Sequence, residues 1–225
     1  MKRSTILSVL LGCALLAGCS KMDISPEEIN PGDKFQDFTA IVTVHKSPTD
    51  TVYFQVDDTT RLYPYNFQST YKGMERIVCG ITVFASKVPG YGYFTEVQWY
   101  DQLDKGTFAN AKPSGANDGL DIISDWMTSC EDGFLTLHYS TWWGSGSVPH
   151  TFTLVSGQNP SDPYEVLLVQ NANGDVKGEI ADSIVYFDIN SLPDTGDSYK
   201  TLTLKWTDSG DKIAEKEFRF KTRKP

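Results

Sequence analysis

The sequence has little positive charge, no long apolar run after its first residues and no segment with the spacing of an amphipathic helix. Its 225 residues carry 20 Lys and Arg against 29 Asp and Glu, which gives a formal net charge of −9 at pH 7. An acid excess of this size disfavours nucleic-acid binding, because that needs basic patches that displace counterions from phosphates. It also disfavours adhesion to anionic lipid headgroups. We therefore expect no nucleic-acid partner.

Catalytic and metal-binding patterns are also missing. The only histidines are His45, His138 and His150, no HExxH-type spacing relates them, and we interpret them as structural. The GSGS segment at 144–147 lacks the GxSxG order of a nucleophilic serine, and the segment 171–182 has valine where a calcium loop requires glycine. We expect hairpin connections at both. Acidic residues are plentiful, but no spacing marks out a glycosidase pair. The sequence predicts no enzyme, no metal site and no cofactor.

The N-terminus has the layout of an export signal. A basic Lys2-Arg3 pair precedes the apolar stretch Ile6–Ala17, which is too short to span a membrane as a helix. Leu16–Cys19 (LAGC) resembles the bacterial lipobox, at which the thiol is acylated and the preceding peptide is removed. The resemblance implies a signal peptide at residues 1–18. A plain signal peptide with an incidental cysteine is the alternative.

Acylation would make Cys19 a lipid attachment site. Several acyl chains hold a protein in a membrane almost permanently, so the membrane is a predicted partner through this residue. Ser20, rather than Asp, follows the cysteine and favours the outer membrane; the periplasmic face and the cell surface both stay open. Residues 19–34 are polar and contain Pro26 and Pro31, which is typical of a flexible tether.

Two cysteines remain in the body of the chain. A disulfide between Cys79 and Cys130 would tie its two halves together and stabilise it by about 4 kcal/mol in the chain-entropy model. Against a bridge, Cys79 shares strand parity with Ile77 and Ile81, which is typical of a free buried cysteine. The sequence leaves both alternatives open.

The remainder predicts an all-β protein with two domains. Runs rich in β-branched and aromatic residues alternate with turn segments, and five strands fit before Asn110. Strand character disappears around residues 110–119, and we place the domain boundary there, with one domain at residues 35–112 and the other at 113–225. In the second, residues such as Leu135, Leu137 and Tyr139 alternate with polar ones, which is typical of antiparallel sheets with one wet face. About seven strands suggest an immunoglobulin-like β-sandwich.

The chain resembles the NigD-like lipoproteins of Bacteroides and its relatives. The similarity rests on Trp126, the turn at 131–133, the strand FLTLHY at 134–139, His150 at the start of the next strand, and MERIVCGITVF with Arg76. The resemblance implies an N-terminal OB-like barrel followed by a β-sandwich. The family has no established catalytic residues, so none is carried over. Its name comes from a gene of a bacteriocin locus, which implies bacteriocin production or immunity as one functional alternative.

Four aromatic residues are the candidate ligand contacts. Trp142 and Trp143 lie beside the GSGS loop, and Trp99 and Tyr100 end a strand near the domain junction. Exposed rings near sheet edges can stack on sugars, and the OB face binds oligosaccharides in other proteins. Packing in the core and at the junction is the alternative interpretation.

The family resemblance also implies O-glycosylation. Exported proteins of such bacteria are modified at Asp-Ser/Thr-apolar or Asp-Ser/Thr-Thr tripeptides, and three segments fit: those with Thr51, Thr59 and Ser183.

The functional prediction is a non-enzymatic outer-membrane lipoprotein that binds an envelope protein or a glycan. A carbohydrate-active protein of a glycan-uptake system and a bacteriocin-associated lipoprotein are the alternatives.

Overall fold

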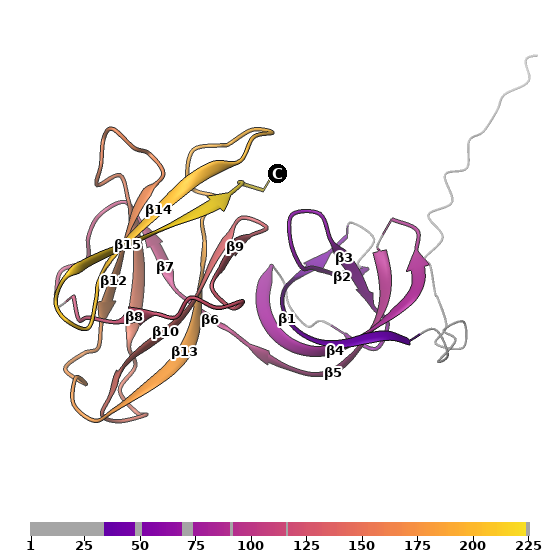
Figure 1. Ribbon diagram of the computed structural model, residues 1–225, viewed down its shortest axis with the longest axis horizontal. Helices are drawn as coiled ribbons and strands as arrows, with labels where there is room; N and C mark the ends of the chain where they lie inside the picture. The colour runs from indigo at the N-terminus through magenta and orange to yellow at the C-terminus, as the bar shows by residue number, and fades with distance from the viewer. Residues whose placement is uncertain (1–33, 48–50, 69–73, 91, 116, 224–225) are drawn as a thin grey trace, which may run out of the picture.

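The computed structural model describes residues 34–47, 51–68, 74–90, 92–115 and 117–223, which form two β domains that pack against each other (Figure 1). The predicted signal peptide, Cys19 and nearly all of the predicted tether lie outside the described residues. Within the described part the regular elements are all strands, and no helix there could cross a membrane. The all-β prediction is confirmed.

The first domain is a closed five-stranded barrel. Its strands are β1 (Lys34–Lys46), β2 (Val52–Gln55), β3 (Arg61–Pro64), β4 (Glu75–Val88) and β5 (Gly92–Gln102). They follow one another around the barrel in the order β1-β2-β3-β5-β4, and β3 pairs with β5 in parallel. This is the five-stranded Greek-key arrangement of an OB fold, so the sequence prediction is confirmed.

Strand β1 is buried on both faces over its second half. Val42 and Val44 point into the barrel, where they pack with a core that includes Phe54 and Ile77. Ile41 directly precedes Val42 and points to the opposite face, where it packs in a separate cluster with residues of the sandwich. Because successive side chains of a strand point to opposite faces, one strand serves both the barrel core and the contact between domains.

The second domain is a sandwich of two sheets, each of five strands. One sheet contains β6 (Asp104–Lys105), β8 (Asp121–Ile122), β9 (Ser129–Glu131), β10 (Phe134–Trp143) and β13 (Glu179–Asp188). The other contains β7 (Thr107–Ala109), β11 (Thr151–Ser156), β12 (Glu165–Asn171), β14 (Lys200–Thr207) and β15 (Ile213–Phe220).

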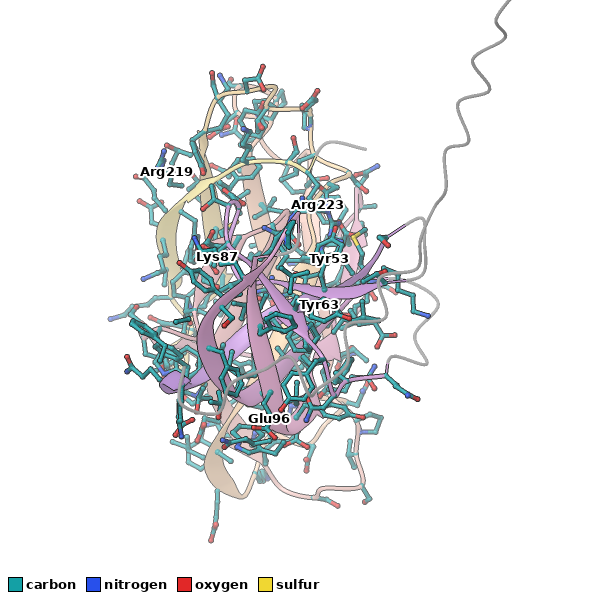
Figure 2. All side chains as sticks on the ribbon, turned by 90° about the vertical axis from the view of Figure 1, so that its right-hand side faces the viewer. Tyr53, Tyr63, Lys87, Glu96, Arg219 and Arg223 are labelled. Atoms are coloured by element: carbon teal, nitrogen blue, oxygen red, sulfur yellow. The ribbon has the colours of Figure 1, made fainter. Side chains whose placement is uncertain are left out.

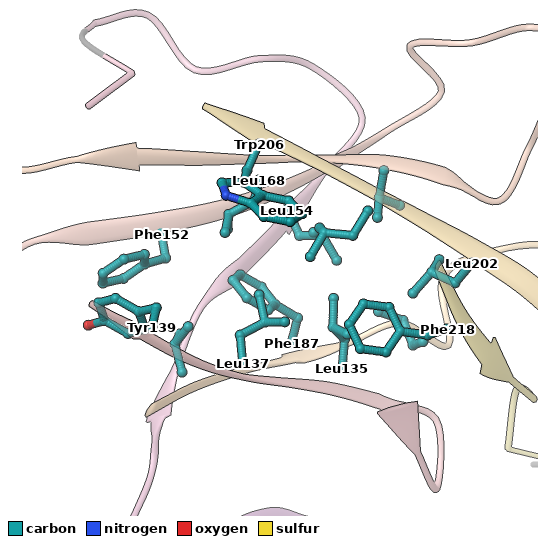
Figure 3. Packing of buried hydrophobic residues seen from close by; sticks show 14 of the residues in the cluster. Leu135, Leu137, Tyr139, Phe152, Leu154, Leu168, Phe187, Leu202, Trp206 and Phe218 are labelled. Atoms are coloured by element: carbon teal, nitrogen blue, oxygen red, sulfur yellow. The ribbon is translucent and has the colours of Figure 1, made fainter. Parts of the chain in front are cut away.

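The alternating pattern read from the sequence builds the core between these sheets. Leu135, Leu137 and Tyr139 of β10 meet apolar side chains of the facing sheet, such as Leu154 and Trp206 (Figure 3). Thr136 and His138 lie between them on the opposite face and are also buried, so the wet face predicted from the alternation is wrong for this part of β10. The two-sheet sandwich is confirmed.

Three details differ from the sequence prediction. The boundary lies before residue 112, because β6 pairs with β13 and β7 pairs with β11, so both belong to the sandwich. Three strand pairs of the sandwich are parallel. The segments 144–150 and 172–178 link the two sheets and are not hairpins, since β10 and β13 lie in one sheet and β11 and β12 in the other. The predicted boundary is misplaced because β6 and β7 are only two and three residues long, and strands this short have no recognisable alternation in the sequence.

Cys79 and Cys130 are free thiols, so the disulfide alternative is wrong. Cys79 lies in the barrel core, while Cys130 packs against the core of the sandwich. The two side chains thus serve two separate cores. Burial raises the pKa of Cys79 to about 12 and also raises the pKa of Cys130, which keeps both thiols protonated and unreactive.

Candidate binding cleft at the domain junction

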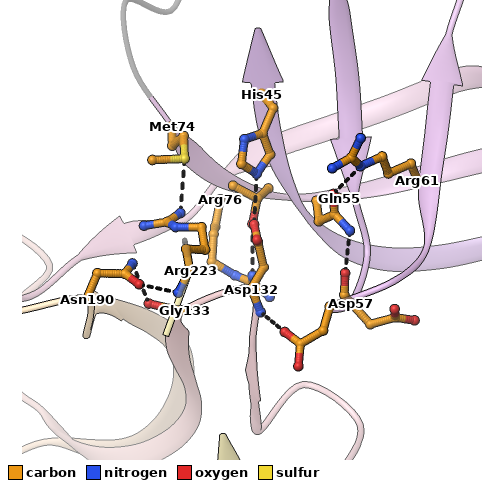
Figure 4. A network of polar contacts seen from close by, with 12 residues as sticks. His45, Gln55, Asp57, Arg61, Met74, Arg76, Asp132, Gly133, Asn190 and Arg223 are labelled. Atoms are coloured by element: carbon orange, nitrogen blue, oxygen red, sulfur yellow. Dashed lines mark hydrogen bonds and ion pairs between the residues drawn. The ribbon is translucent and has the colours of Figure 1, made fainter. Parts of the chain in front are cut away.

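Arg76 is the buried charge at the centre of the domain junction (Figure 4). It lies on β4, its Nη1 donates to Thr43 Oγ1 at 3.0 Å, and its guanidinium lies over the ring of Phe134, 5.5 Å from the centroid. Burial lowers its pKa, and the nearby carboxylates Glu131 and Asp132 act in the opposite direction. Acids of the sandwich therefore favour the charge of this barrel cation, while its burial opposes that charge.

Further polar contacts cross the junction beside Arg76. His45 Nε2 lies 2.8 Å from Asp132 Oδ2, and the backbone N–H of Asp132 donates to Asp58 Oδ1 at 2.9 Å. The His45 ring stacks on Tyr53 with centroids 4.9 Å apart. Asp132 has a positive φ of 50° and starts the tight turn before β10, so this turn is held by the barrel on both its backbone and its side chain.

The end of the chain closes over the same place. Arg223 donates from Nη2 to Asp188 Oδ2 at 3.1 Å, its Nη1 lies 3.0 Å from Met74 Sδ of the barrel, and its guanidinium lies 4.2 Å from the centroid of the Phe134 ring. Phe134 thus contacts two guanidinium groups, one from each domain. Such cation–π contacts are worth more when they are desolvated.

An apolar cleft of about 670 Å³ opens where barrel and sandwich meet. Its lining comes from both domains and includes Phe38, Ala40, Leu62, Ile81, Val83 and Trp126. Several aromatic residues of the lining are unusually exposed: Phe35 is 70 % and Trp126 is 56 % exposed. Exposed apolar surface that surrounds a concave site is typical of a binding surface.

The charged side chains at the cleft are few. Lys87 lines it from the barrel, with its ammonium 4.6 Å from the centroid of the Tyr93 ring; Figure 2, which looks at the barrel end, marks its position. Glu131 lines it from the sandwich. Burial raises the pKa of Glu131, and the charge of Arg76 opposes this rise. Among the described residues, the cleft consequently offers apolar contact area with one cation and one acid.

None of the four aromatic residues predicted from the sequence lines this cleft. Trp99 lies over Gly80, where a Cβ atom would come within 2.1 Å of its Nε1, and Tyr100 packs edge-on against Phe67 with centroids 5.1 Å apart. Trp99 and Tyr100 keep about half of their surface exposed.

The pair Trp142–Trp143 divides as strand geometry requires. Trp143 stacks on His150 at 4.0 Å and donates from Nε1 to the Ala181 carbonyl, so its packing interpretation holds. Trp142 is 43 % exposed on the outer face of its sheet, where its cross-strand neighbour is Ile180. The structure does not bring Trp142 together with Trp99.

The three predicted glycosylation residues differ in accessibility. Thr59 is exposed, although its Oγ1 donates to Asp57 at 2.9 Å. Thr51 is half-buried, and its preceding Asp50 lies outside the described residues. Ser183 lies within β13 and hydrogen-bonds Tyr139. Glycosylation stays a prediction, and Thr59 is the most accessible of the three.

Sequence reasoning missed Phe35, Phe38, Tyr93 and Trp126 as cleft residues. A signal existed in the first strand, because two aromatic residues, Phe35 and Phe38, lie close together beside a polar tether. Trp126 is identified from the sequence only through the family resemblance, since it lies in a turn with no periodicity.

His138 is held between two carboxylates on the sandwich. Its Nδ1 lies 2.8 Å from Asp125 Oδ2 and its Nε2 lies 2.9 Å from Asp182 Oδ2. Burial acts to lower the pKa of His138, but the hydrogen bonds to the two carboxylates outweigh it, and the pKa is raised. The described residues contain no group of three or more candidate metal ligands, so we interpret His138 as a structural cation.

This arrangement predicts a pH-dependent contribution to stability. Because its folded pKa is raised, protonated His138 stabilises the fold fully below its unfolded pKa of about 6.5, and the stabilisation is lost as the pH rises through the folded pKa. His138→Gln should therefore lower the melting temperature more at pH 6 than at pH 9. Thermal melts of both proteins across this range measure the difference. With Asp182→Asn, the stabilisation by protonated His138 should be lost at a lower pH, because one of its two carboxylate partners is removed. A melting-temperature difference between wild type and His138→Gln that does not change with pH would contradict the assignment.

Arg76 predicts a second, larger effect. Arg76→Met leaves Glu131 and Asp132 without their buried cation, and we expect a loss of about 3–5 kcal/mol of unfolding free energy at pH 7. Adding Glu131→Gln should restore part of it, because the uncompensated acid is removed. Urea unfolding followed by tryptophan fluorescence measures both variants. If the double variant is no more stable than the single one, charge compensation is not the reason for the loss.

Comparison with known proteins places this geometry in a family. Residues 105–220 match the family model described as the NigD-like C-terminal beta sandwich domain. The search of curated proteins found no match.

Solved structures with both domains are similar over most of the chain. A protein of Parabacteroides distasonis, described as a candidate toxin-related protein, is 23% identical with a TM-score of 0.67, over 83% of this chain and 94% of that one. A NigD-like immunity protein of Bacteroides caccae is 16% identical with a TM-score of 0.57, over 82% and 94%. A protein of Bacteroides fragilis, described as a candidate lipoprotein, is 12% identical with a TM-score of 0.54, over 84% and 99%. At these identities the similarity shows the fold alone. Together with the match over the sandwich, the barrel-and-sandwich architecture and its junction, this leads to one conclusion: the chain belongs to the NigD-like family.

Proposed function

We propose that this protein is an outer-membrane lipoprotein that binds a partner of the cell envelope in the cleft between its two domains, without catalysing a reaction. Lipid on Cys19 would hold it at the membrane, and the two β domains would project from the tether. The sequence pattern LAGC supports the lipid attachment, and so does the fold shared with the Bacteroides fragilis protein described as a candidate lipoprotein.

The observation that carries the binding role is the apolar cleft with walls from both domains. A cavity of about 670 Å³ lies within the range of ligand sites. Its charged lining, Lys87 and Glu131, is sparse, which favours recognition by shape and apolar contact. The surface aromatic residues Trp99 and Trp142 lie elsewhere and in separate places, so they give weaker support to a glycan ligand.

An immunity role is the second candidate. One similar structure is described as a NigD-like immunity protein and another as toxin-related. An immunity lipoprotein would capture a toxin polypeptide before it reaches the membrane, and the same cleft is the surface that would contact it.

The proposed lipid anchor can be tested by removing the thiol of Cys19. Cys19→Ser in the full-length chain should move the protein from the outer-membrane fraction to soluble periplasmic or inner-membrane fractions, because acylation needs the thiol. Mass spectrometry of the wild-type N-terminal peptide should show acyl chains on Cys19. An unmodified, uncut N-terminus recovered from cells would contradict the anchor.

The proposed binding cleft can be tested by crosslinking. A photo-crosslinking amino acid in place of Trp126 should form covalent adducts with an envelope component in living cells, because this side chain lines the cleft. The same replacement at Trp142 is the matched control, since that residue is similarly exposed but lies on the outer face of the sandwich. Adducts are read as shifted bands and identified by mass spectrometry. Equal adducts at both positions, or none at Trp126, would count against the cleft.

A further inference from the structure

The first half of β1 has a strand neighbour on only one side among the described residues. β4 pairs with β1 from Lys34 to Val44, whereas β2 pairs with it only from Thr43 to Lys46. In an antiparallel ladder, successive residues direct their N–H and C=O groups alternately to the two sides. About half of the backbone polar groups of residues 36–42 therefore point away from β4, toward a side where the barrel supplies no paired strand.

The apolar cleft runs along this free edge. Four consecutive residues of β1, Phe38–Ile41, line it, although successive side chains of a strand point to opposite faces. Consecutive residues can share one cleft only where the cleft meets the strand at its edge. Ala40 packs with the barrel-core cluster and Ile41 with the junction cluster, so the edge lies between the barrel wall and the sandwich wall.

The usual protection against pairing is confined to the start of the edge. Exposed edge strands are commonly blunted by charges, proline or bulges. Lys34 and Asp37 form an ion pair at the start of β1, with 2.7 Å between Nζ and Oδ2, and the irregularity in register lies at residues 34–36. From Phe38 to Ile41 the strand has neither charge nor proline. An unprotected edge beside exposed aromatic rings is suited to pairing with another chain.

We propose that the cleft binds an extended polypeptide, which adds to β1 as an extra strand. This inference rests on the binding function proposed above and names the class of partner. The guest backbone would pair with the free groups of residues 36–42. Its side chains would alternate between the barrel wall at Val56 and Leu62 and the sandwich wall at Trp126.

The geometry defines the guest further. Seven residues at about 3.3 Å each give a paired length of about 23 Å. Because the barrel wall is apolar and the sandwich wall presents Trp126 beside Ser129 and Glu131, the guest should carry a mainly apolar run rather than a strictly alternating one. The net charge of −9 favours basic residues at its ends.

Two other occupants fit less well. A lipid chain would cover the walls but leave the N–H and C=O groups of the edge unpaired in an apolar site, which is unfavourable. A glycan carries hydroxyl groups without the regular donor and acceptor spacing of a strand, and its polarity does not match the walls. Pairing along a sheet edge is a known mode of peptide recognition.

The experiment selects peptides on the mature chain, lipidated at Cys19, in lipid nanodiscs. A displayed library of ten-residue linear peptides should yield sequences with a central apolar run. Ala85→Trp, which fills the cleft from an exposed lining position, should weaken the binding of a selected peptide at least tenfold. Val176→Trp, on an exposed loop of the sandwich, is the matched control and should leave it unchanged.

Two N-methylated versions of the selected peptide separate strand addition from simple apolar contact. Both keep all side chains, and the methyl groups block alternate N–H groups on one edge in the first and on the other edge in the second. Strand addition predicts that one version loses at least tenfold in affinity and the other binds as before. Bound peptide should also slow hydrogen exchange at alternate amides of residues 36–42.

Equal affinity of both methylated versions would overturn strand addition, as would unchanged exchange along β1. So would a library that yields no peptide sensitive to Ala85→Trp, or binding of a fatty acid or oligosaccharide that Ala85→Trp abolishes. In the last case, crosslinking at Trp126 would still succeed. Failure of the polypeptide assignment is thus distinguishable from failure of the cleft as a binding site.

Discussion

The buried cation of Arg76 needs acids of the other domain close by, and this requirement restricts how the two domains meet. Arg76 has no exposed surface, and its guanidinium Nε and Nη2 have no hydrogen-bond partner in the described part of the chain. A buried charge is tolerable only when opposite charge lies close by. That charge, on Glu131 and Asp132, comes from the other domain. The barrel is therefore electrostatically incomplete without the sandwich, and a shift of one domain along the other would separate the charges.

The same requirement shapes the cleft. The charge of Glu131 favours the Arg76 cation at the junction. Glu131 also lines the cleft, and the turn that it precedes is tied to the barrel through Asp132 and His45. Trp126, the principal aromatic of the sandwich wall, lies a few residues before this turn. The width of the cleft consequently depends on contacts that do not face it. A relatively rigid junction would keep the cleft open in the absence of a partner, which reduces the ordering cost of binding.

The sequence predicted those features that repeat along a strand. The alternation of Leu135, Leu137 and Tyr139 predicted the sandwich core, and the parity of Cys79 with its neighbours indicated a buried thiol. The parity rule also explains why Trp142 and Trp143 face opposite ways. The boundary and the shortest strands could not be predicted, because β6 to β9 are each only two or three residues long and owe their existence to pairing with β10, β11 and β13.

The cleft could not be predicted for a related reason. Its residues come from a strand edge, a turn and a second domain, and Phe38 and Trp126 are far apart in sequence without any shared period. The sequence instead indicated the tryptophans of β5 and β10 as ligand contacts. In the structure each of these rings has a local packing partner or lies on an isolated part of the surface. A ring on a flat sheet face contacts a ligand from one side only. The rings of the cleft face a concave space whose other wall belongs to a different domain and whose floor is a strand edge that no other described strand pairs. It is this convergence, and not the exposure of any single aromatic residue, that supports the proposed binding site.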